Sequence, residues 1–236
     1  MTTSCNKPGP EEALHLLDEG NRRFVEGRST HPHADAARRG LAATSQQADY
    51  AYATVISCSD SRVPVEILFD AGIMDLFVVR VAGNVCNTDE IGCIEYGLAH
   101  VRTPLLVVLG HTQCGAVTAV TRVLQGHGHP LERNIPPLVR GIEPAVRRAL
   151  ESGATENEET VFRRAVEENV WEAIGNLFLA SPRTRELVHG GQARVCGAIY
   201  ELETGCVRWL DEARVAELLD AAERDPVRAV EPFAEE

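Results

Sequence analysis

The sequence predicts an α/β fold: a sheet with a parallel core and helices on both faces, an antiparallel edge strand and an N-terminal helical extension. Three short apolar runs, at 52–57, 76–81 and 105–109, are typical of strands that are buried on both faces. Helix-like stretches separate these runs, and such alternation predicts a parallel, doubly wound sheet. Two further strand-like runs flank a Thr204-Gly205 turn and predict a hairpin at the sheet edge.

The N-terminal extension begins with an amphipathic helix at 11–27. Its inward-facing residues recur at three- and four-residue steps, and Gly27 ends the helix. The next segment, 28–50, is polar and predicts a loop that holds one short helix. The predicted inward-facing residues of the first helix are Leu14, Leu17, Asn21, Phe24 and Val25.

The remaining helices are predicted where apolar residues face one way and charged residues face the other. They lie at 64–71, 89–101, 114–124, 135–151, 158–180 and 212–222. The hairpin strands are predicted at 194–201 and 206–210. We therefore expect one domain over 1–236, which comprises a helical arm at 1–50, an α/β core at 51–211 and a C-terminal helix and tail at 212–236.

Length and composition limit the class of protein. The 236 residues are 44% hydrophobic and 25% charged, which is enough to bury a core and excludes a disordered or collagen-like chain. Every apolar run is shorter than the roughly 18 residues that a membrane helix needs. The first residues lack a basic region followed by an apolar stretch, so we expect no signal peptide and a cytoplasmic location.

The charged and sulfur-containing residues exclude several kinds of chemistry. The formal net charge is -12, and no basic face is available for general nucleic-acid binding. Lys7 is the only lysine, which excludes a phosphate loop ending in Gly-Lys-Ser/Thr and lysine Schiff-base chemistry in the folded body. Seven cysteines in a chain with no apparent signal sequence argue against a disulfide framework. They favour a metal site or a reactive thiol.

Two short segments carry the strongest chemical signal. ISCSDSRVP places Cys58, Asp60 and Arg62 directly after the first strand, and LGHTQCGAV places His111 and Cys114 directly after the third. Ligands of open α/β sheets gather outside the carboxyl ends of strands, where the strand order reverses. If the first and third strands are neighbours, Cys58, His111 and Cys114 converge. Two thiolates and one imidazole suit zinc with a fourth position left open.

The spacing of the second segment supports this interpretation. His111 and Cys114 are three residues apart across a loop-to-helix junction, so both can face one point. Gly110 and Gly115 permit a tight turn, and a helix N-terminus favours a thiolate at Cys114. His-x-x-Cys is a weak signal by itself. Its combination with Cys-x-Asp-x-Arg, each at a strand end, is much more specific.

The residues alone leave two interpretations open for Asp60 and Arg62. They could form a surface ion pair, worth well under about 1 kcal/mol. Alternatively, Asp60 could orient a bound water beside the metal, or become the fourth ligand and close the site. In the first of these two roles, Arg62 would hold Asp60 away from the metal through a bidentate contact.

Several of these segments together resemble the β-class carbonic anhydrases. CSDSR and GHTQCGAV, separated by FVVRVAGN, carry the resemblance. It extends to LDEGNRRFVEG at 17–27 and to GAIYELETGCVRWL at 197–210, and it covers roughly 11–211. The resemblance implies a β-carbonic-anhydrase-like domain over most of the chain.

The resemblance also implies roles for individual residues. Asp60 and Arg62 would be the catalytic dyad, with Asp60 as a fourth metal ligand in a closed state. The Gly115 amide would lie where substrate or bicarbonate is held, and Gly83 and Asn84 would shape the backbone beside the site. One catalytic Zn²⁺ per chain would be bound by Cys58, His111 and Cys114.

The implied reaction is the reversible hydration of carbon dioxide to bicarbonate and a proton by zinc-bound hydroxide. Two thiolates offset the charge of the metal, so we predict that activity rises towards alkaline pH. One alternative is a carbonyl sulfide or carbon disulfide hydrolase on the same zinc site. A non-catalytic, zinc-stabilised binding protein is a further alternative, against which the Asp60–Arg62 pair argues. The resemblance implies a homodimer or higher homo-oligomer, with no nucleic-acid or membrane partner.

Other histidines and cysteines receive lesser roles. His127 and His129, in a predicted loop, are candidates for a proton shuttle, although solvated loop histidines without a role are more common. A second metal site there would have only two visible ligands. We expect surface or structural roles for His31, His33, His100 and His189, and we expect His15 to lie along the N-terminal helix. We expect packing roles for Cys86, Cys93, Cys196 and Cys206, and an exposed Cys5.

Overall fold

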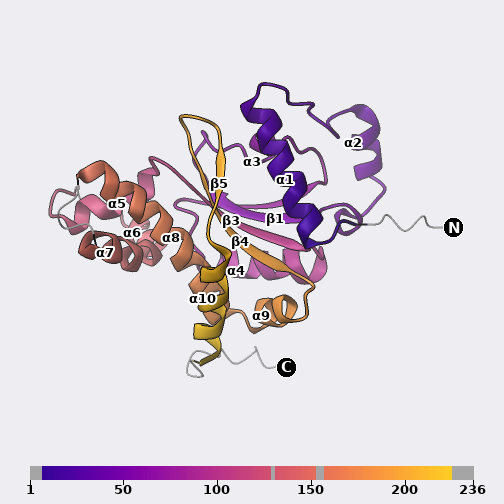
Figure 1. The fold of residues 1–236 in the computed structure, drawn as a ribbon. Helices are drawn as coiled ribbons and strands as arrows, with labels where there is room; N and C mark the ends of the chain where they lie inside the picture. Colours follow the sequence, from indigo (N-terminus) through magenta and orange to yellow (C-terminus); the bar gives the residue numbers. More distant parts are fainter. Residues whose placement is uncertain (1–6, 129–130, 153–156, 225–236) are drawn as a thin grey trace.

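Five strands form one sheet in the order β2-β1-β3-β4-β5 in the computed structural model, which describes residues 7–128, 131–152 and 157–224 (Figure 1). The first four strands run parallel, and β5 pairs antiparallel with β4 at the edge. This confirms the predicted parallel core and antiparallel edge strand. The strands are β1 (Ala53–Cys58), β2 (Leu76–Val81), β3 (Leu105–His111), β4 (Arg194–Tyr200) and β5 (Val207–Trp209).

Both faces of the sheet are covered, because the side chains of each parallel strand contribute to two separate apolar clusters. In β1, Ala53 and Val55 join the cluster that contains residues of α1 (Pro10–Val25) and α3 (Val65–Leu68). Ile56 and Cys58 join the cluster on the opposite face. The helices that contribute to that second cluster are α4 (Thr88–Glu95), α5 (Gly115–Leu124), α6 (Ile135–Val139), α7 (Glu143–Ser152), α8 (Glu158–Ala180), α9 (Pro182–His189) and α10 (Glu212–Arg224).

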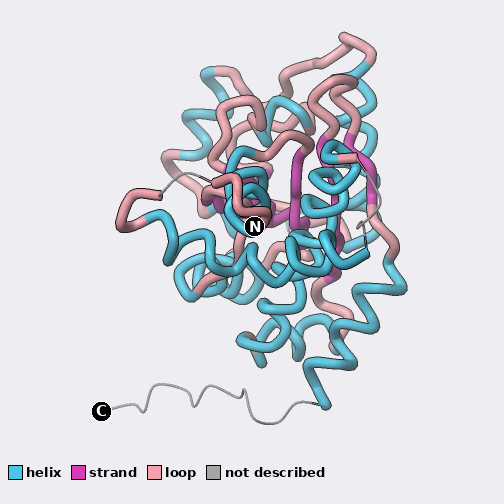
Figure 2. The backbone as a smooth tube through the Cα atoms, turned by 90° about the vertical axis from the view of Figure 1, so that its left-hand side faces the viewer, coloured by secondary structure: helices cyan, strands magenta, loops and turns pink. Residues whose placement is uncertain are grey.

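The helices are distributed unevenly around the sheet. Figure 1 shows α1, α3 and the short α2 (Ala36–Ala42) on one side, with α9 and α10 on the other. The helices α5, α6 and α7 gather with the first part of α8 into a helical lobe beside the sheet. The tube in Figure 2 shows the strands surrounded by helices. Three short non-α turns complete the described elements: Gln47–Asp49, Tyr96–His100 and Arg140–Ile142.

The N-terminal helix α1 is held by close packing and by hydrogen bonds from a buried asparagine. A Cβ added at Gly20 would lie 1.9 Å from the Phe69 carbonyl oxygen, so this contact requires glycine. Asn21 Nδ2 donates to the Leu68 and Gly205 carbonyls, at 3.1 and 2.9 Å. Asn21 therefore faces inward as predicted, whereas Val25 is 41% exposed and the prediction for it was wrong.

The segment that precedes α2 is anchored by buried carboxylates. Asp70 is 3% exposed and accepts hydrogen bonds from the Thr30 and His31 amides and from Arg23 Nε, the last at 2.6 Å. Burial opposes ionisation of Asp70, but these donors prevail and lower its pKa to about 2. The 28–50 segment thus contains one short α-helix, as predicted, and is fixed to the body of the protein.

Lys7 fastens the chain ahead of α1. Its Nζ donates to three backbone carbonyls, those of Ala48, Val101 and Arg102, at 2.9, 2.8 and 3.0 Å. Two segments that are far apart in the sequence, around residues 48 and 101, are thereby joined to the start of the first helix.

Two helical predictions were wrong in detail. The single helix predicted at 135–151 is broken at Arg140–Ile142. Pro144 has no N–H to donate to the Arg140 carbonyl, so an α-helix cannot continue regularly through this point. The helix α9 was not predicted, although Ser181 accepts a hydrogen bond from the Thr184 amide as an N-cap and Pro182 follows it at the first helical position.

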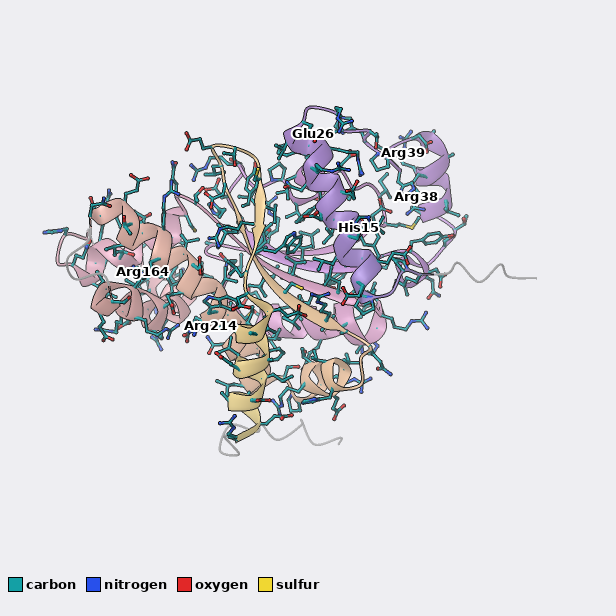
Figure 3. All side chains as sticks on the ribbon, viewed as in Figure 1. His15, Glu26, Arg38, Arg39, Arg164 and Arg214 are labelled. Carbon is teal, nitrogen blue, oxygen red and sulfur yellow. The ribbon has the colours of Figure 1, made fainter. Side chains whose placement is uncertain are left out.

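Cysteine packing was predicted correctly for two of the four residues. Cys86 and Cys196 are buried, whereas Cys93 and Cys206 are exposed, so the packing prediction for those two was wrong. Figure 3 shows His15 on the surface of α1, the helix in which it was predicted to lie. His31, His33, His100 and His189 are also exposed, while Cys5, His129 and the tail lie outside the described residues. Within the described ranges, no helix combines the length and apolarity that crossing a bilayer requires.

Candidate metal centre

The sheet order brings the two motif segments together. Strand β1 lies between β2 and β3, and its parallel pairing with β3 places Ser57 opposite Leu109. Cys58 is the last residue of β1, His111 is the last residue of β3, and Cys114 is the N-cap of α5. The order reverses between β1 and β3, because β1 connects to β2 on one side and β3 leads to β4 on the other. The three side chains lie at this switch point.

The geometry of the three side chains suits a tetrahedral metal ion. Their ligand atoms all lie within 4.8 Å of one another, and the two Sγ atoms are 4.0 Å apart. Zinc–ligand bonds of about 2.0–2.3 Å at tetrahedral angles require ligand atoms roughly 3.3–3.8 Å apart. Cys58, His111 and Cys114 are 5%, 0% and 1% exposed, so a bound ion would be largely shielded by protein.

The His111 ring is oriented with one nitrogen free for a metal. Its Nδ1 lies 2.9 Å from the Thr112 carbonyl oxygen, and this contact requires Nδ1 to carry the proton and donate it. The neutral ring then has a lone pair on Nε2, and Nε2 is buried with no hydrogen-bond partner among the described residues. A buried, unpaired acceptor beside two sulfurs fits a metal-binding role, because burial without a partner would otherwise be costly.

The sulfur atoms are surrounded by groups that favour negative charge. The Gly83 amide donates to Cys58 Sγ at 3.3 Å, and Cys114 sits at the amino end of α5, where backbone amides are unpaired. A hydrogen bond from the neighbouring Cys114 thiol is the main reason that the pKa of Cys58 is lowered, to about 4. The same contact raises the pKa of Cys114. Cysteine binds metals as the thiolate, so a divalent ion bound here would favour loss of the thiol protons.

Asp60 and Arg62 form a bidentate pair beside these ligands. Arg62 Nε and Nη2 donate to the two Asp60 oxygens at 3.0 and 2.6 Å, and the Arg62 amide donates to Oδ1 at 2.9 Å. These bonds hold the pKa of Asp60 well below its usual range. Arg62 Nη2 also reaches the Gln113 carbonyl at 3.1 Å, so one guanidinium joins both motif segments. Asp60 Oδ2 lies 3.9 Å from His111 Nε2.

Gly115 is the first residue of α5 and faces open space. A Cβ added to this residue would meet no atom within 4 Å. Gly115 is also exposed, and the first amides of a helix lack partners within the helix, so its N–H is a candidate donor to a bound ligand.

Two residues that support the site were not identified from the sequence. Arg80, in β2, donates from Nε to the Cys58 carbonyl at 3.1 Å and from Nη2 to the Asp60 carbonyl at 2.7 Å. Asn169, in the middle of α8, donates to the Gly83 carbonyl at 2.8 Å. A charged residue within the apolar run of β2 and an asparagine on an apolar helix face are the signals that could have drawn attention to them.

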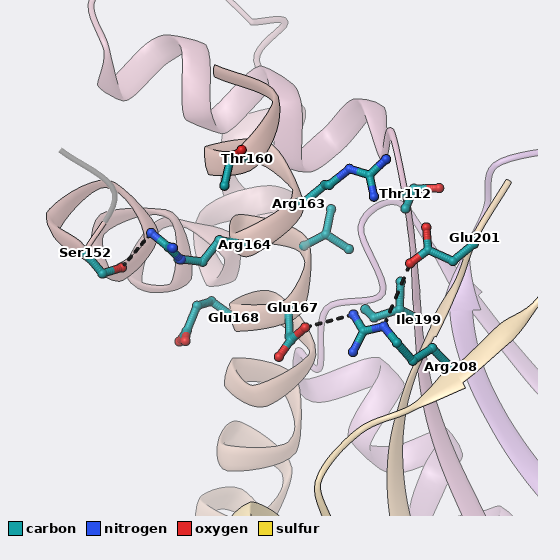
Figure 4. Close-up of a pocket in the computed structure, with 11 residues that line it drawn as sticks. Thr112, Ser152, Thr160, Arg163, Arg164, Glu167, Glu168, Ile199, Glu201 and Arg208 are labelled. Carbon is teal, nitrogen blue, oxygen red and sulfur yellow. Dashed lines mark hydrogen bonds and ion pairs between the residues drawn. The ribbon is translucent and has the colours of Figure 1, made fainter. Parts of the chain in front are cut away.

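A cavity among the described residues lies away from the three candidate metal ligands. Figure 4 shows a groove of about 470 Å³ between α8 and the β4–β5 hairpin, with Thr112 at one end. Its charged residues pair with one another: Arg208 contacts Glu167 at 2.9 Å and Glu201 at 3.9 Å. None of Cys58, His111 and Cys114 lines this groove. His127, one candidate shuttle, is exposed in the loop after α5.

Comparisons with known proteins agree with this geometry. A family model described as carbonic anhydrase matches residues 53–207. Carbonic anhydrase 2 of Mycobacterium tuberculosis strain H37Rv is 35% identical over 196 residues, which are 83% of this chain and 90% of that protein. A carbonic anhydrase of Mycolicibacterium smegmatis is 35% identical over 198 residues, 84% of this chain and 92% of that protein.

Solved structures have the same fold. A Coccomyxa β-carbonic anhydrase in complex with acetazolamide is 27% identical, with a TM-score of 0.65 over 84% of this chain and 86% of that chain. The β-carbonic anhydrase CafA of Aspergillus fumigatus has a TM-score of 0.70 over 94% of this chain and 99% of that chain, at 24% identity. This second likeness supports the fold alone.

Proposed function

This chain belongs to the β-class carbonic anhydrase family, and from that premise we propose that it catalyses the reversible hydration of carbon dioxide at a zinc ion held by Cys58, His111 and Cys114. The observation that carries the proposal is the group of two sulfurs and one imidazole nitrogen within 4.8 Å of one another. The unpaired, buried Nε2 of His111 gives independent support for a cation at this point.

Zinc, when bound, is a Lewis acid that makes a water-derived nucleophile available near neutral pH. The residues around the site would do the rest. Asp60, kept ionised by Arg62, would accept a hydrogen bond from the nucleophile and so fix the direction of its attack. The amide of Gly115, the first residue of α5, would donate to a substrate or bicarbonate oxygen. Arg80 would keep the Cys58–Asp60 segment in place through its two backbone contacts.

The bidentate contact between Arg62 and Asp60 favours an open site over a closed one. Metal ligation by Asp60 would require its carboxylate to leave two guanidinium bonds and one amide bond. We therefore propose that Asp60 acts beside the metal. A proton acceptor is also needed because hydration releases a proton. Of the two candidates, His127 and His129, only the exposed His127 lies within the described residues, and we propose it for this role.

We further propose assembly into a homodimer or a larger homo-oligomer. Strand β2 is an edge of the sheet, and Tyr96 is 52% exposed while its ring packs 6.0 Å from Phe77 of that strand. An edge strand flanked by an exposed aromatic side chain is a surface that a second copy could cover. Sedimentation velocity of the purified protein tests this, and a monomer at micromolar concentration would contradict it.

The cytoplasmic location stays a prediction.

The substrate proposal is tested by stopped-flow hydration of carbon dioxide, with carbonyl sulfide and carbon disulfide hydrolysis measured on the same preparation. We expect carbon dioxide hydration to dominate and its rate to rise between mildly acidic and alkaline pH. A matched pair of variants locates the chemistry: Cys58→Ala should abolish turnover and zinc content, whereas the exposed Cys93→Ala should change neither. Full turnover in Cys58→Ala, or a preference for a sulfur substrate, would overturn the proposal.

A further inference from the structure

A buried asparagine on α8 has no role in the scheme above. The buried residues of α8 are apolar with one exception, Asn169, which is 1% exposed. Its neighbours along the helix face, Val166 and Val170, pack onto the sheet. Burial of a polar side chain in such a position is costly unless its hydrogen bonds are satisfied. The hydrogen-bond partner of Asn169 therefore indicates the role of this residue.

That partner is the turn that contacts the metal-ligating sulfur. Asn169 Nδ2 donates to the Gly83 carbonyl at 2.8 Å, and the Gly83 amide donates to Cys58 Sγ at 3.3 Å. Gly83 has a φ of +78° and is the third residue of a turn closed by the hydrogen bond from the Asn84 amide to the Val81 carbonyl. A turn with glycine in this conformation directs its central amide outward, here towards the sulfur.

Steric contacts limit where Gly83 can move. A Cβ at Gly83 would lie 2.6 Å from Ile142 Cδ1 and 3.1 Å from Ala116 Cβ, so α5 and the Arg140–Ile142 turn enclose it. The helix α8 comes close for a similar reason: a Cβ at Gly110 would lie 2.8 Å from Val170 Cγ2. Gly110, the residue before His111, thus allows α8 to lie close to the sheet. From this position Asn169 of α8 reaches Gly83.

We propose that Asn169 is a positioning residue for the metal centre: it holds Gly83 so that the Gly83 amide donates to the Cys58 sulfur. This inference rests on the proposed zinc site. A hydrogen bond to a thiolate withdraws electron density that the sulfur would otherwise give to the metal. The two hydrogen bonds, from Asn169 to Gly83 and from Gly83 to Cys58, therefore offset part of the negative charge that the two thiolates supply. A bound metal would be a stronger Lewis acid with these hydrogen bonds than without them.

The test replaces zinc with Co²⁺, whose thiolate-to-metal charge-transfer absorption reports on the sulfur directly. Asn169→Leu is similar in size and cannot donate. We expect its charge-transfer band to move to lower energy, its activity midpoint to move to higher pH, and its zinc affinity, by chelator competition, to fall roughly 10-fold or more. Asn169→Asp, nearly the same shape but without a donor at neutral pH, should show the same three changes.

The matched control is Asn21→Leu. Asn21 is also buried and also donates to backbone carbonyls, but its partners Leu68 and Gly205 lie against the opposite face of the sheet. This variant should lose thermal stability and keep the wild-type cobalt spectrum and pH midpoint. It separates the cost of removing any buried asparagine from the effect on the metal.

The outcomes are distinguishable. A wild-type protein without a charge-transfer band would refute the zinc site and, with it, this inference. A wild-type band that Asn169→Leu and Asn169→Asp leave unchanged would refute the role of Asn169 alone. If neither variant folds, Asn169 is a requirement for folding and not a positioning residue, and the inference fails.

Discussion

Arg62 contacts both segments that carry the candidate site. Its guanidinium donates to both oxygens of Asp60 and to the Gln113 carbonyl, between His111 and Cys114. Because these bonds keep the pKa of Asp60 well below its usual range, Asp60 stays ionised from mildly acidic to alkaline pH. The predicted rise of activity with pH must therefore come from the nucleophile and not from Asp60.

Removal of the guanidinium tests this assignment. In Arg62→Leu the Asp60 carboxylate loses its two side-chain bonds and is free to turn, so we expect kcat to fall roughly 10- to 100-fold. Zinc content, measured by mass spectrometry, should stay near one per chain. The control is Arg183→Leu, whose guanidinium pairs with Glu186 on the exposed side of α9. A wild-type kcat in Arg62→Leu would show that the pair is only a surface contact.

Local sequence was sufficient to find some residues of the site and insufficient for others. Cys58, His111 and Cys114 could be predicted to converge because each follows a recognisable buried strand. Asn169 could not be connected to them, because its contact depends on the path of a helix that lies 86 residues from Gly83 in the chain. Arg80 was visible in the sequence, but only the fold shows which carbonyls it reaches.

The packing of α8 on the sheet determines how close this helix comes to β3, the strand that ends at His111. Gly110 of β3 and Gly197 of β4 both face α8, and a Cβ at Gly197 would lie 3.0 Å from Val170 Cγ1. Without these glycines the helix would have to move outward. Since Asn169 projects from the same helix, a shift of α8 would also disturb its bond with Gly83.

Gly110→Ala tests this close approach. The added methyl group would meet Val170 Cγ2 at 2.8 Å and Ile199 Cδ1 at 3.0 Å, so we expect overpacking to lower the free energy of unfolding by about 1–3 kcal/mol. Urea titration followed by circular dichroism measures the change. The control Gly92→Ala, in α4 with nothing within 4 Å, should be stabilising by about 0.5–1 kcal/mol. Equal stability of the two variants would argue against tight packing.

The loop ahead of α2 depends on Asp70, and this dependence varies with pH. The folded pKa of about 2 lies below the ordinary value of about 3.9, so the stabilisation is complete above about pH 4 and is lost as the pH falls through 2. We expect Asp70→Asn to reduce the free energy of unfolding at pH 7 on the order of 2 kcal/mol, and less near pH 2. Urea titrations at both pH values measure this. A loss that is independent of pH would contradict it.

The sequence predicted most helices and strands but misjudged where helices end. The Ser181-Pro182 pair is a recognisable helix start, so α9 was predictable in principle. The break at Arg140–Ile142 follows from Pro144, yet a periodic apolar pattern continues across it and favoured one long helix. Periodicity reports which side of a segment is buried and does not report whether its backbone bonds are continuous.

The whole protein is organised around one sheet shared by two apolar clusters. Each strand of the parallel core contributes to both clusters, so neither face can unfold without exposing the other. The three candidate metal ligands lie together at one end of this sheet, and of the three only Cys58 and Cys114 belong to an apolar cluster. The division into arm, core and C-terminal helix stays a prediction.

This arrangement predicts that the fold survives loss of the metal. Exhaustive chelation should abolish turnover and lower the melting temperature, while the far-ultraviolet circular dichroism stays that of the native protein. Turnover should return when Zn²⁺ is added back. A chelated protein that loses its helical signal would instead show that the metal centre is a structural requirement, as in small zinc-dependent folds.

The attachment of Lys7 has a practical consequence. Because it is the only lysine in the sequence, reagents that acylate amines find a single side-chain target. That amine is engaged with three carbonyls, and burial and the nearby Arg102 lower its pKa to about 8. The speed with which a fluorescent succinimidyl ester labels Lys7 therefore measures how often the leading segment detaches, without any mutation being introduced.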